Sequence, residues 1–188
     1  MYLVNPYSYP TATPEELYNQ STTGSDVDSD YSRYHGQSFA SPNTEVTGEI
    51  TKLQFKMKKT GSPSFTFIGV YYPNGDITSP TYTNTSRNVS SLDTSFGSFI
   101  DFEFDSPPTF ENGDYLGIEF GATGDGTNHA SIQSSGYISA PVTGAESGKY
   151  WDGDSWEPEA CNASSQCRYM VMTITAVSYT HLRAHETK

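Results

Sequence analysis

The sequence predicts an all-β fold: an antiparallel β-sandwich of jelly-roll type, with about eight or nine strands and an extended N-terminal arm. Three observations lead to this prediction. Apolar and polar side chains alternate along several short runs, which is the period of a strand with one buried face. Ser and Thr make up a quarter of the chain, and Gly and Pro separate the runs as turn signals. Nowhere does a helical pattern persist, which excludes a fold of alternating strands and helices.

The strongest strand signal is the alternation of Leu53, Phe55 and Met57 with polar residues. A second apolar run ends at Asn74-Gly75, a pair that predicts a hairpin. The last apolar run is the most hydrophobic of all, so we expect it to be a central strand. In chain order, the predicted strands cover residues 35–40, 52–58, 65–72, 88–92, 99–105, 115–120, 130–134, 149–151 and 168–176.

The chain divides into three predicted regions. Residues 1–32 form the arm, because their prolines forbid a regular helix and favour extended backbone. A single helical turn is the expectation for Glu15–Tyr18, directly after Pro14. Residues 33–177 form the sandwich. Residues 178–188 do not share the Ser-, Gly- and aromatic-rich composition of the rest and look like translated sequencing-adaptor read-through. We treat them as a non-native tail and exclude them from the fold.

Composition excludes some partners. The chain has 10 Lys and Arg against 22 Asp and Glu, a net charge of -12. Such a chain offers no basic footprint for nucleic acid and is repelled by anionic membrane surfaces. No apolar run is long enough to cross a bilayer, so membrane insertion is not expected.

Cys161 and Cys167 are close in sequence, which favours a small disulfide loop outside the cytosol over two free thiols. Two cysteines without a nearby histidine do not make a zinc site. We therefore expect an extracellular protein, on a cell or virion surface.

Several segments follow one another in an order that resembles a known pattern. The segments are Gln37–Phe39, Ile50–Met57, Thr60–Pro63, Gly113–Ile118, Tyr150–Trp156 and a closing apolar strand. Their order resembles the jelly-roll-like β-sandwich modules of phage structural proteins, microbial surface proteins and environmental filament subunits, over residues 33–176. The resemblance implies a non-enzymatic role in display, adhesion or fibre building.

Each of two groups of acidic residues has a functional interpretation and an alternative in which the residues are simply solvated surface. Asp101, Glu103 and Asp105 share one strand face, with a spacing that overlaps the carboxylate separation of glycosidases. The plain interpretation is a solvated face opposite buried phenylalanines, and polar/apolar alternation favours it.

The second acidic group is Asp26, Asp28 and Asp30, which resembles the first half of a calcium-binding EF-hand loop but lacks its turn glycine and closing glutamate. No cofactor is expected beyond weak Ca²⁺ binding there, or at Asp152 and Asp154. The alternative is a solvated acidic linker.

Two sequence features predict a relation to glycans: a group of aromatic residues that could bind them, and sequons that could carry them. Tyr150, Trp151 and Trp156 surround an acidic turn, where exposed rings can stack on sugars; the alternative is a hairpin that caps the end of the sandwich. Four Asn-x-Ser sequons are candidate glycosylation sites, unless they merely reflect the Ser-rich composition. They begin at Asn19, Asn84, Asn88 and Asn162.

The arm carries the main functional hypothesis. It is too apolar to be a solubilising tail, and an extended segment can add a strand to the sheet edge of a neighbour. Repetition of that contact builds a filament, whereas the alternative is that the arm covers its own sheet edge. The residues concerned are Tyr2, Leu3, Val4, Tyr7 and Tyr9.

The sequence thus predicts a glycosylated, self-assembling structural subunit of a surface fibre and not an enzyme. A carbohydrate-binding module is the alternative, and a glycoside hydrolase is a third hypothesis. No nucleophilic triad supports a hydrolase, since two of the four histidines lie in the tail.

Overall fold

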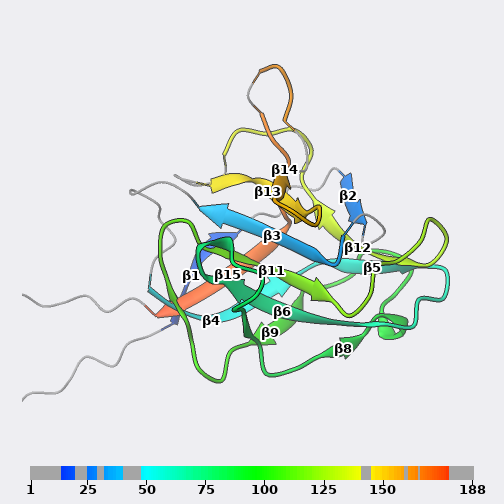
Figure 1. Cartoon of the computed structure of the whole chain (residues 1–188), viewed down its shortest axis with the longest axis horizontal. Helices are drawn as coiled ribbons and strands as arrows, with labels where there is room; N and C mark the ends of the chain where they lie inside the picture. Colours follow the sequence, from blue (N-terminus) through cyan, green and yellow to red (C-terminus); the bar gives the residue numbers. More distant parts are fainter. Residues whose placement is uncertain are drawn as a thin grey trace, which may run out of the picture.

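The computed structural model describes residues 14–19, 25–28, 32–39, 48–140, 145–158, 161–164 and 166–177 (Figure 1). All strand pairs in this part of the chain are antiparallel, and its only helices are two single 3₁₀ turns, η1 (Pro73–Gly75) and η2 (Val89–Ser91). The predicted all-β class and antiparallel sandwich-like architecture are confirmed. The strong alternation of the sequence is the cause, because it gives each strand one face to bury.

Three hydrogen-bonded sheets make up the fold. The five-stranded sheet contains β1 (Pro14–Asn19), β15 (Met172–Val177), β4 (Gly48–Phe55), β9 (Ile100–Glu103) and β10 (Thr109–Phe110). The three-stranded sheet contains β2 (Ser25–Asp28), β12 (His129–Ser134) and β5 (Met57–Thr60). The seven-stranded sheet contains β14 (Trp156–Pro158), β13 (Ala145–Trp151), β3 (Tyr34–Phe39), β11 (Tyr115–Phe120), β6 (Thr66–Tyr72), β7 (Thr81–Tyr82) and β8 (Arg87–Asn88).

The five-stranded and three-stranded sheets are continuous. Only Lys56 separates β4 from β5, and its carbonyl accepts a hydrogen bond from the backbone of Gln133 on β12. Ser134, at the end of β12, bridges to Met170 just before β15. Together the two sheets form one layer of the sandwich, and the seven-stranded sheet forms the other.

Phenylalanines fill the space between the layers. Phe102 on β9 is fully buried, with its ring centre 6.1 Å from that of Phe55 and 5.8 Å from that of Phe67 on the opposite layer. Elsewhere in the core, the ring centres of Phe39 on β3 and Phe110 on β10 lie 5.7 Å apart. These edge-to-face contacts are the preferred geometry of aromatic pairs, and they join the two layers directly.

The predicted strands correspond to observed ones with two corrections. The structure describes fifteen short strands where about eight or nine were expected. The additional ones include the two-residue strands β7, β8 and β10, which are too short for any alternation to show. The segment predicted as a strand over 88–92 is mostly η2, because the side chain of Asn88 accepts a hydrogen bond from the backbone of Ser90 and starts a turn.

The hairpin predicted at Asn74-Gly75 is present, with a longer loop than two residues. β6 and β7 pair antiparallel, with Val70 opposite Tyr82. Asn74 itself has a φ of 50°, a left-handed conformation that asparagine tolerates better than most residues.

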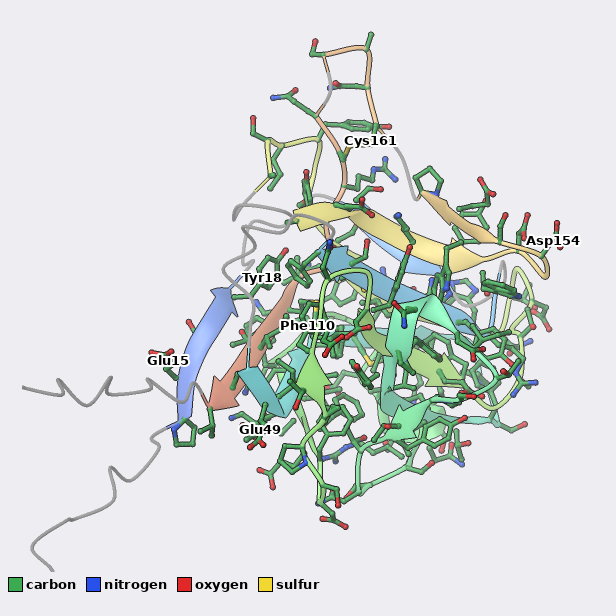
Figure 2. The ribbon with its side chains drawn as sticks, turned by 60° about the vertical axis from the view of Figure 1, so that its left-hand side comes forward. Glu15, Tyr18, Glu49, Phe110, Asp154 and Cys161 are labelled. Carbon is green, nitrogen blue, oxygen red and sulfur yellow. A yellow bond between two sulfur atoms is a disulfide. The ribbon has the colours of Figure 1, made fainter. Side chains whose placement is uncertain are left out.

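The structure places part of the predicted arm on the body. Residues 14–19 form β1 and pair with β15, and residues 25–28 form β2 and pair with β12. Glu15–Tyr18 is therefore strand, not a helical turn, and its Tyr18 ring packs 5.1 Å from that of Phe39. Figure 2 shows β1 alongside β15 at the margin of the body. The boundary predicted at residue 33 thus falls inside the sandwich, while Tyr2, Leu3, Val4, Tyr7, Tyr9 and the tail 178–188 lie outside the described residues.

We expect Phe102→Ala to lower the free energy of unfolding by about 3–5 kcal/mol, because it leaves a cavity between the two layers. Urea unfolding followed by fluorescence measures this loss. The matched control is Glu103→Ala, the next residue on the exposed face of β9, with an expected change within about 0.5 kcal/mol. Equal losses for the two variants would contradict the placement of Phe102 in the core.

Candidate functional site

The outer side of the seven-stranded sheet carries a group of aromatic rings. Directly opposed residues of an antiparallel pair point to the same side of the sheet. Leu116, Ile118 and Phe120 of β11 point into the core, so Tyr115 and Glu119, which alternate with them, point outward. By the same register, five partly exposed rings share this outer side, which we call the aromatic face: Tyr34, Tyr82, Tyr115, Trp151 and Trp156.

Trp156 on β14 is the centre of the aromatic face. Its ring stacks on that of Tyr115 with centres 4.7 Å apart and planes at 18°. Trp151 meets it edge-on at 5.8 Å, and Tyr72 lies beneath it at 5.4 Å. The indole nitrogen donates a hydrogen bond of 2.7 Å to the carbonyl of Gly75 in η1. Trp156 is therefore held firmly by contacts from four different segments.

Glycines make room for this ring. A Cβ at Gly36 would lie 3.4 Å from the ring atoms of Trp156 and 3.3 Å from Tyr115. A Cβ at Gly75, where φ is 71°, would lie 2.9 Å from the ring of Tyr115. Side chains at these two positions would lift the indole off the sheet, so the flatness of the aromatic face depends on glycine.

Charged groups border the rings on two sides. Beside Tyr115, the ammonium of Lys149 lies 5.3 Å from the ring centre and 2.6 Å from the Glu146 carboxylate. That carboxylate also accepts a hydrogen bond from the hydroxyl of Ser38. Burial alone raises the pKa of Glu146, but the hydrogen bonds from Lys149 and Ser38 outweigh it, so the net pKa shift is downward.

On the opposite side, Glu119 joins Tyr82 to Arg33. The phenol of Tyr82 donates a hydrogen bond of 2.8 Å to Glu119, which also lies 3.3 Å from the guanidinium of Arg33. Partial burial and the bond to Glu119 raise the pKa of Tyr82 to about 12, so the phenol stays protonated near neutral pH. Tyr82 and Glu119 also line a hollow of about 200 Å³ together with Ile68.

The three aromatic residues singled out in the sequence do not form one surface. Trp151 and Trp156 pair on the aromatic face, but Tyr150 pairs with His35 and points to the other side of the strand. The sequence prediction missed Tyr34, Tyr82 and Tyr115. The outward position of Tyr115 could have been predicted, because Tyr115 alternates with Leu116 and Ile118 in a run already predicted as a strand.

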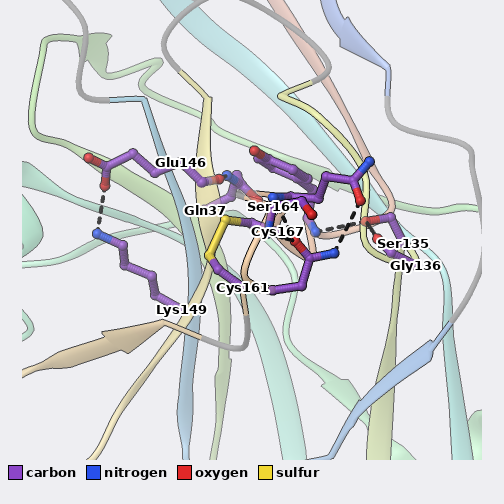
Figure 3. The surroundings of a disulfide bond; sticks show 11 residues. Gln37, Ser135, Gly136, Glu146, Lys149, Cys161, Ser164 and Cys167 are labelled. Carbon is purple, nitrogen blue, oxygen red and sulfur yellow. Dashed lines mark hydrogen bonds and ion pairs between the residues drawn. A yellow bond between two sulfur atoms is a disulfide. The ribbon is translucent and has the colours of Figure 1, made fainter.

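The predicted disulfide between Cys161 and Cys167 is present. It closes a loop that projects from the body, as Figures 1 and 2 show. Inside this loop, the side chain of Asn162 accepts backbone hydrogen bonds from Ser164 and Gln166 and donates to the side chain of Gln166. Gln37 of β3 and Glu146 lie close to the disulfide (Figure 3). Fully buried Gln37 donates to the carbonyl of Glu146 and accepts from the backbone of Met170.

The sequons differ in their surroundings. Asn84 and Asn88 are exposed, whereas Asn162 is half-buried and its amide nitrogen is bound to Gln166. The amide nitrogen is the atom that carries an N-linked glycan, and in Asn84 it also donates a hydrogen bond, to Asp105. Exposure therefore decides, and it makes Asn84 and Asn88 better placed than half-buried Asn162 to carry a glycan. Asn19 lies at the end of β1, but its side chain is outside the described residues.

The acidic triplet lies on a solvated strand face. Asp101, Glu103 and Asp105 are exposed, with Phe102 and Phe104 buried between them. Asp101 accepts a hydrogen bond of 2.7 Å from Gln54 and pairs with Lys52 at 3.8 Å, while Asp105 accepts from Asn84 at 3.2 Å. Nothing in this geometry singles out one carboxyl as an acid and another as a base.

The described residues contain no group of three or more His, Cys, Asp or Glu positioned for a metal. Of the predicted calcium candidates, Asp26 and Asp28 lie on β2, whose side chains are outside the described set, as is Asp30. Asp152 accepts hydrogen bonds from the backbone of Ser155 and Asp154, which lower its pKa and build the turn of the β13–β14 hairpin.

No helix in the described part of the chain is long and apolar enough to cross a membrane.

In comparisons with known proteins, no family model and no curated protein matches the sequence. A solved structure of the clostridial cysteine protease Cwp84, after propeptide cleavage, matches with a TM-score of 0.52 at 14% identity. The match covers 91% of this chain and 42% of that chain, so this chain spans less than half of the protease. A likeness at this identity shows the fold alone: the class is an all-β, sandwich-like protein.

Acidification should weaken the Glu146–Lys149 contact. A carboxyl with a lowered pKa stabilises the fold above its unfolded pKa, and this contribution is lost as the pH falls through its folded pKa. We therefore expect the melting temperature of the wild type to fall between pH 5 and pH 3 more steeply than that of Glu146→Gln, which cannot titrate there. Parallel curves for the two proteins, measured by calorimetry, would show that this contact carries no stability.

Proposed function

We propose that this chain is a non-enzymatic, extracellular module that binds a carbohydrate chain across its aromatic face. The observation that carries this proposal is the set of five partly exposed rings on one side of a single sheet. The apolar faces of sugar rings stack on aromatic side chains. Trp151 and Tyr82 lie toward opposite ends of this face, on the edge hairpins of the sheet, so an extended chain fits it better than a single sugar.

Polar groups around the rings supply the rest of the recognition. Glu119 and Glu146 accept hydrogen bonds, and Lys149 donates them, which suits the many hydroxyls of a sugar. The single O–H of Tyr82 is already donated to Glu119, so its phenol oxygen is a further acceptor. These side chains are already held by Arg33, Ser38 and each other. A site whose donors and acceptors are fixed before binding loses less conformational entropy when the ligand arrives.

The disulfide supports an extracellular location, because such bonds persist outside the reducing cytosol. Exposed Asn84 and Asn88 are the sequons best placed to carry glycan there. Both lie on the β7–β8 side of the molecule, away from the β13–β14 hairpin that carries Trp151 and Trp156.

Assembly through the N-terminal arm is a second candidate function, favoured by one observation. β1 is the last strand of its sheet in the described residues, and it buries Tyr18 while Glu15 and Glu16 stay exposed. This sheet margin therefore accepts an extended N-terminal segment. Residues 2–9 of a neighbouring molecule could add in the same way beside β1, and repetition would produce a filament.

Replacing Trp151 and Tyr82 together by Ala should weaken carbohydrate binding at least tenfold, because each ring loses its stacking contact with a sugar. Binding of the purified chain to immobilised neutral oligosaccharides, followed by calorimetry with the best ligand, measures this. Tyr137→Ala is the control, since Tyr137 is about as exposed as Tyr82 but lies near the disulfide loop and not on the aromatic face. Failure of the wild type to bind any oligosaccharide, or equal binding by all variants, would refute the proposal.

Deleting residues 1–13 leaves β1 in place and tests assembly separately. If the arm joins molecules, the deleted chain should be monomeric by light scattering while the full chain forms larger species. Removing residues 178–188 is the control and should leave the size unchanged. A full chain that is already monomeric would rule out assembly through the arm, and large species that survive the deletion would place the contact elsewhere.

A further inference from the structure

A second cavity lies at the side of the sandwich, where β8 of the seven-stranded sheet comes close to β9 of the five-stranded sheet. It has a volume of about 320 Å³, near the lower end of the range of about 300–1,000 Å³ typical of small-molecule sites. The loop after η2, residues 92–99, contributes one wall. None of the rings of the aromatic face lines it, so what it binds does not depend on that face.

The cavity has an apolar side. Met57, Phe67 and Leu92 contribute to its lining and are each more than nine-tenths buried. Phe99, at the end of the loop, is half-buried and also lines the cavity. A ring-shaped ligand with one apolar face could therefore lie against carbon atoms that are already in place.

Arg87 gives the cavity a fixed cation. Its guanidinium lies 5.8 Å from the ring centre of Phe102 and donates a hydrogen bond of 3.1 Å to the carbonyl of Asp101. These contacts connect β8 to β9 across the mouth of the sandwich and orient the planar group. The bond to Asp101 uses one of the five N–H donors of a guanidinium, and such a fork matches a carboxylate or sulfate with two parallel hydrogen bonds.

More positive charge lies around the same loop. Lys56 has its ammonium 5.1 Å from the ring centre of Phe99, and that of Lys58 is 4.8 Å from Phe96. Lys59 donates to the carbonyl of Ser90 and so holds the start of the loop. Three lysines and Arg87 thus gather here out of the 10 Lys and Arg of a chain with a net charge of -12. A local excess of this kind attracts anions to one place on an otherwise acidic molecule.

Two aspartates around the cavity, Asp93 and Asp101, bear on the choice of ligand. Asp101 is occupied by Gln54 and Lys52 on the outer surface of the sheet. Asp93 lines the cavity itself. A carboxylate in the lining disfavours a compact multiply charged anion such as phosphate, but it can accept hydrogen bonds from hydroxyl groups.

We propose that this cavity binds an acidic sugar unit of a polysaccharide. The carboxylate or sulfate of the sugar binds the guanidinium of Arg87, its ring lies against Phe99, and a hydroxyl donates to Asp93. The three groups stand on different segments, β8, the end of the loop and its beginning, so the loop is part of the site. This gives the molecule a preference for anionic glycans that the aromatic face alone does not provide.

The test is calorimetric titration of the full chain with three probes: tetragalacturonate, a sulfated tetrasaccharide and neutral cellotetraose. We expect binding of an anionic probe that weakens with added salt, as exposed charge contacts do. Arg87→Gln should weaken it at least tenfold. The matched control is Arg168→Gln, which removes the same charge from another arginine held over an aromatic ring, that of Tyr137 at 5.1 Å, and should leave binding of the anionic probe unchanged.

The outcomes separate the possibilities. Binding of tetragalacturonate alone identifies the carboxylate as the recognised group, and binding of the sulfated probe alone identifies the sulfate. If Arg87→Gln unfolds the protein, Arg87→Lys and Phe99→Ala decide: each should stay folded and bind more weakly than the wild type. No binding of either anionic probe, a loss of cellotetraose binding in Arg87→Gln as large as its loss of anionic-probe binding, or equal losses for Arg87→Gln and Arg168→Gln would overturn the proposal.

Discussion

The close approach of the two layers at Phe102 is the constraint on which the rest of the structure depends. A Cβ at Gly69 on β6 would lie 2.7 Å from the Cβ of Phe102, so the layers meet there only because position 69 has no side chain. From this point Phe102 reaches Phe55 within its own layer and Phe67 across the core. Interiors are packed nearly as densely as organic crystals, so fixing this one contact fixes the spacing of the strands around it.

Aromatic residues have two roles in this chain, on opposite sides of the seven-stranded sheet. On the inner side, phenylalanines pack in edge-to-face contacts among buried aliphatic residues such as Leu53 and Ile118. On the outer side, tyrosines and tryptophans cover the sheet, and glycines at 36 and 75 leave space for the large rings. Tyr72 and Val70 are fully buried although they point outward, because those rings lie over them. The aromatic face is therefore a second, thinner packing layer whose upper surface meets solvent.

The cavity at Arg87 results from the same two-layer construction. Where strands of two facing sheets end at the side of the sandwich, the layers are closed by whatever loop is available. Here the loop is residues 92–99, held just before its start by the bond from Lys59 to Ser90 and at its end by the ring of Phe99 against Lys56. A polar loop over an apolar interior gives a hollow with one apolar side and one charged side. Such an arrangement suits ligands that are themselves half apolar and half polar, as sugars are.

The sequence by itself determined the class of the fold, most of the long strands and the disulfide, because these depend on local alternation and on a spacing of a few residues. Leu53, Phe55, Phe102 and Phe104 are buried as their alternation requires. Tertiary structure alone decided that residues 14–19 belong to the body, since their pairing partner β15 is near the other end of the chain. It also decided which rings share a surface: Tyr150 and Trp151 are neighbours in sequence and lie on opposite sides of a strand, whereas Tyr115 and Trp156 are distant in sequence and stack. Contacts of this kind follow from the order of strands in a sheet, which alternation within a single strand does not encode.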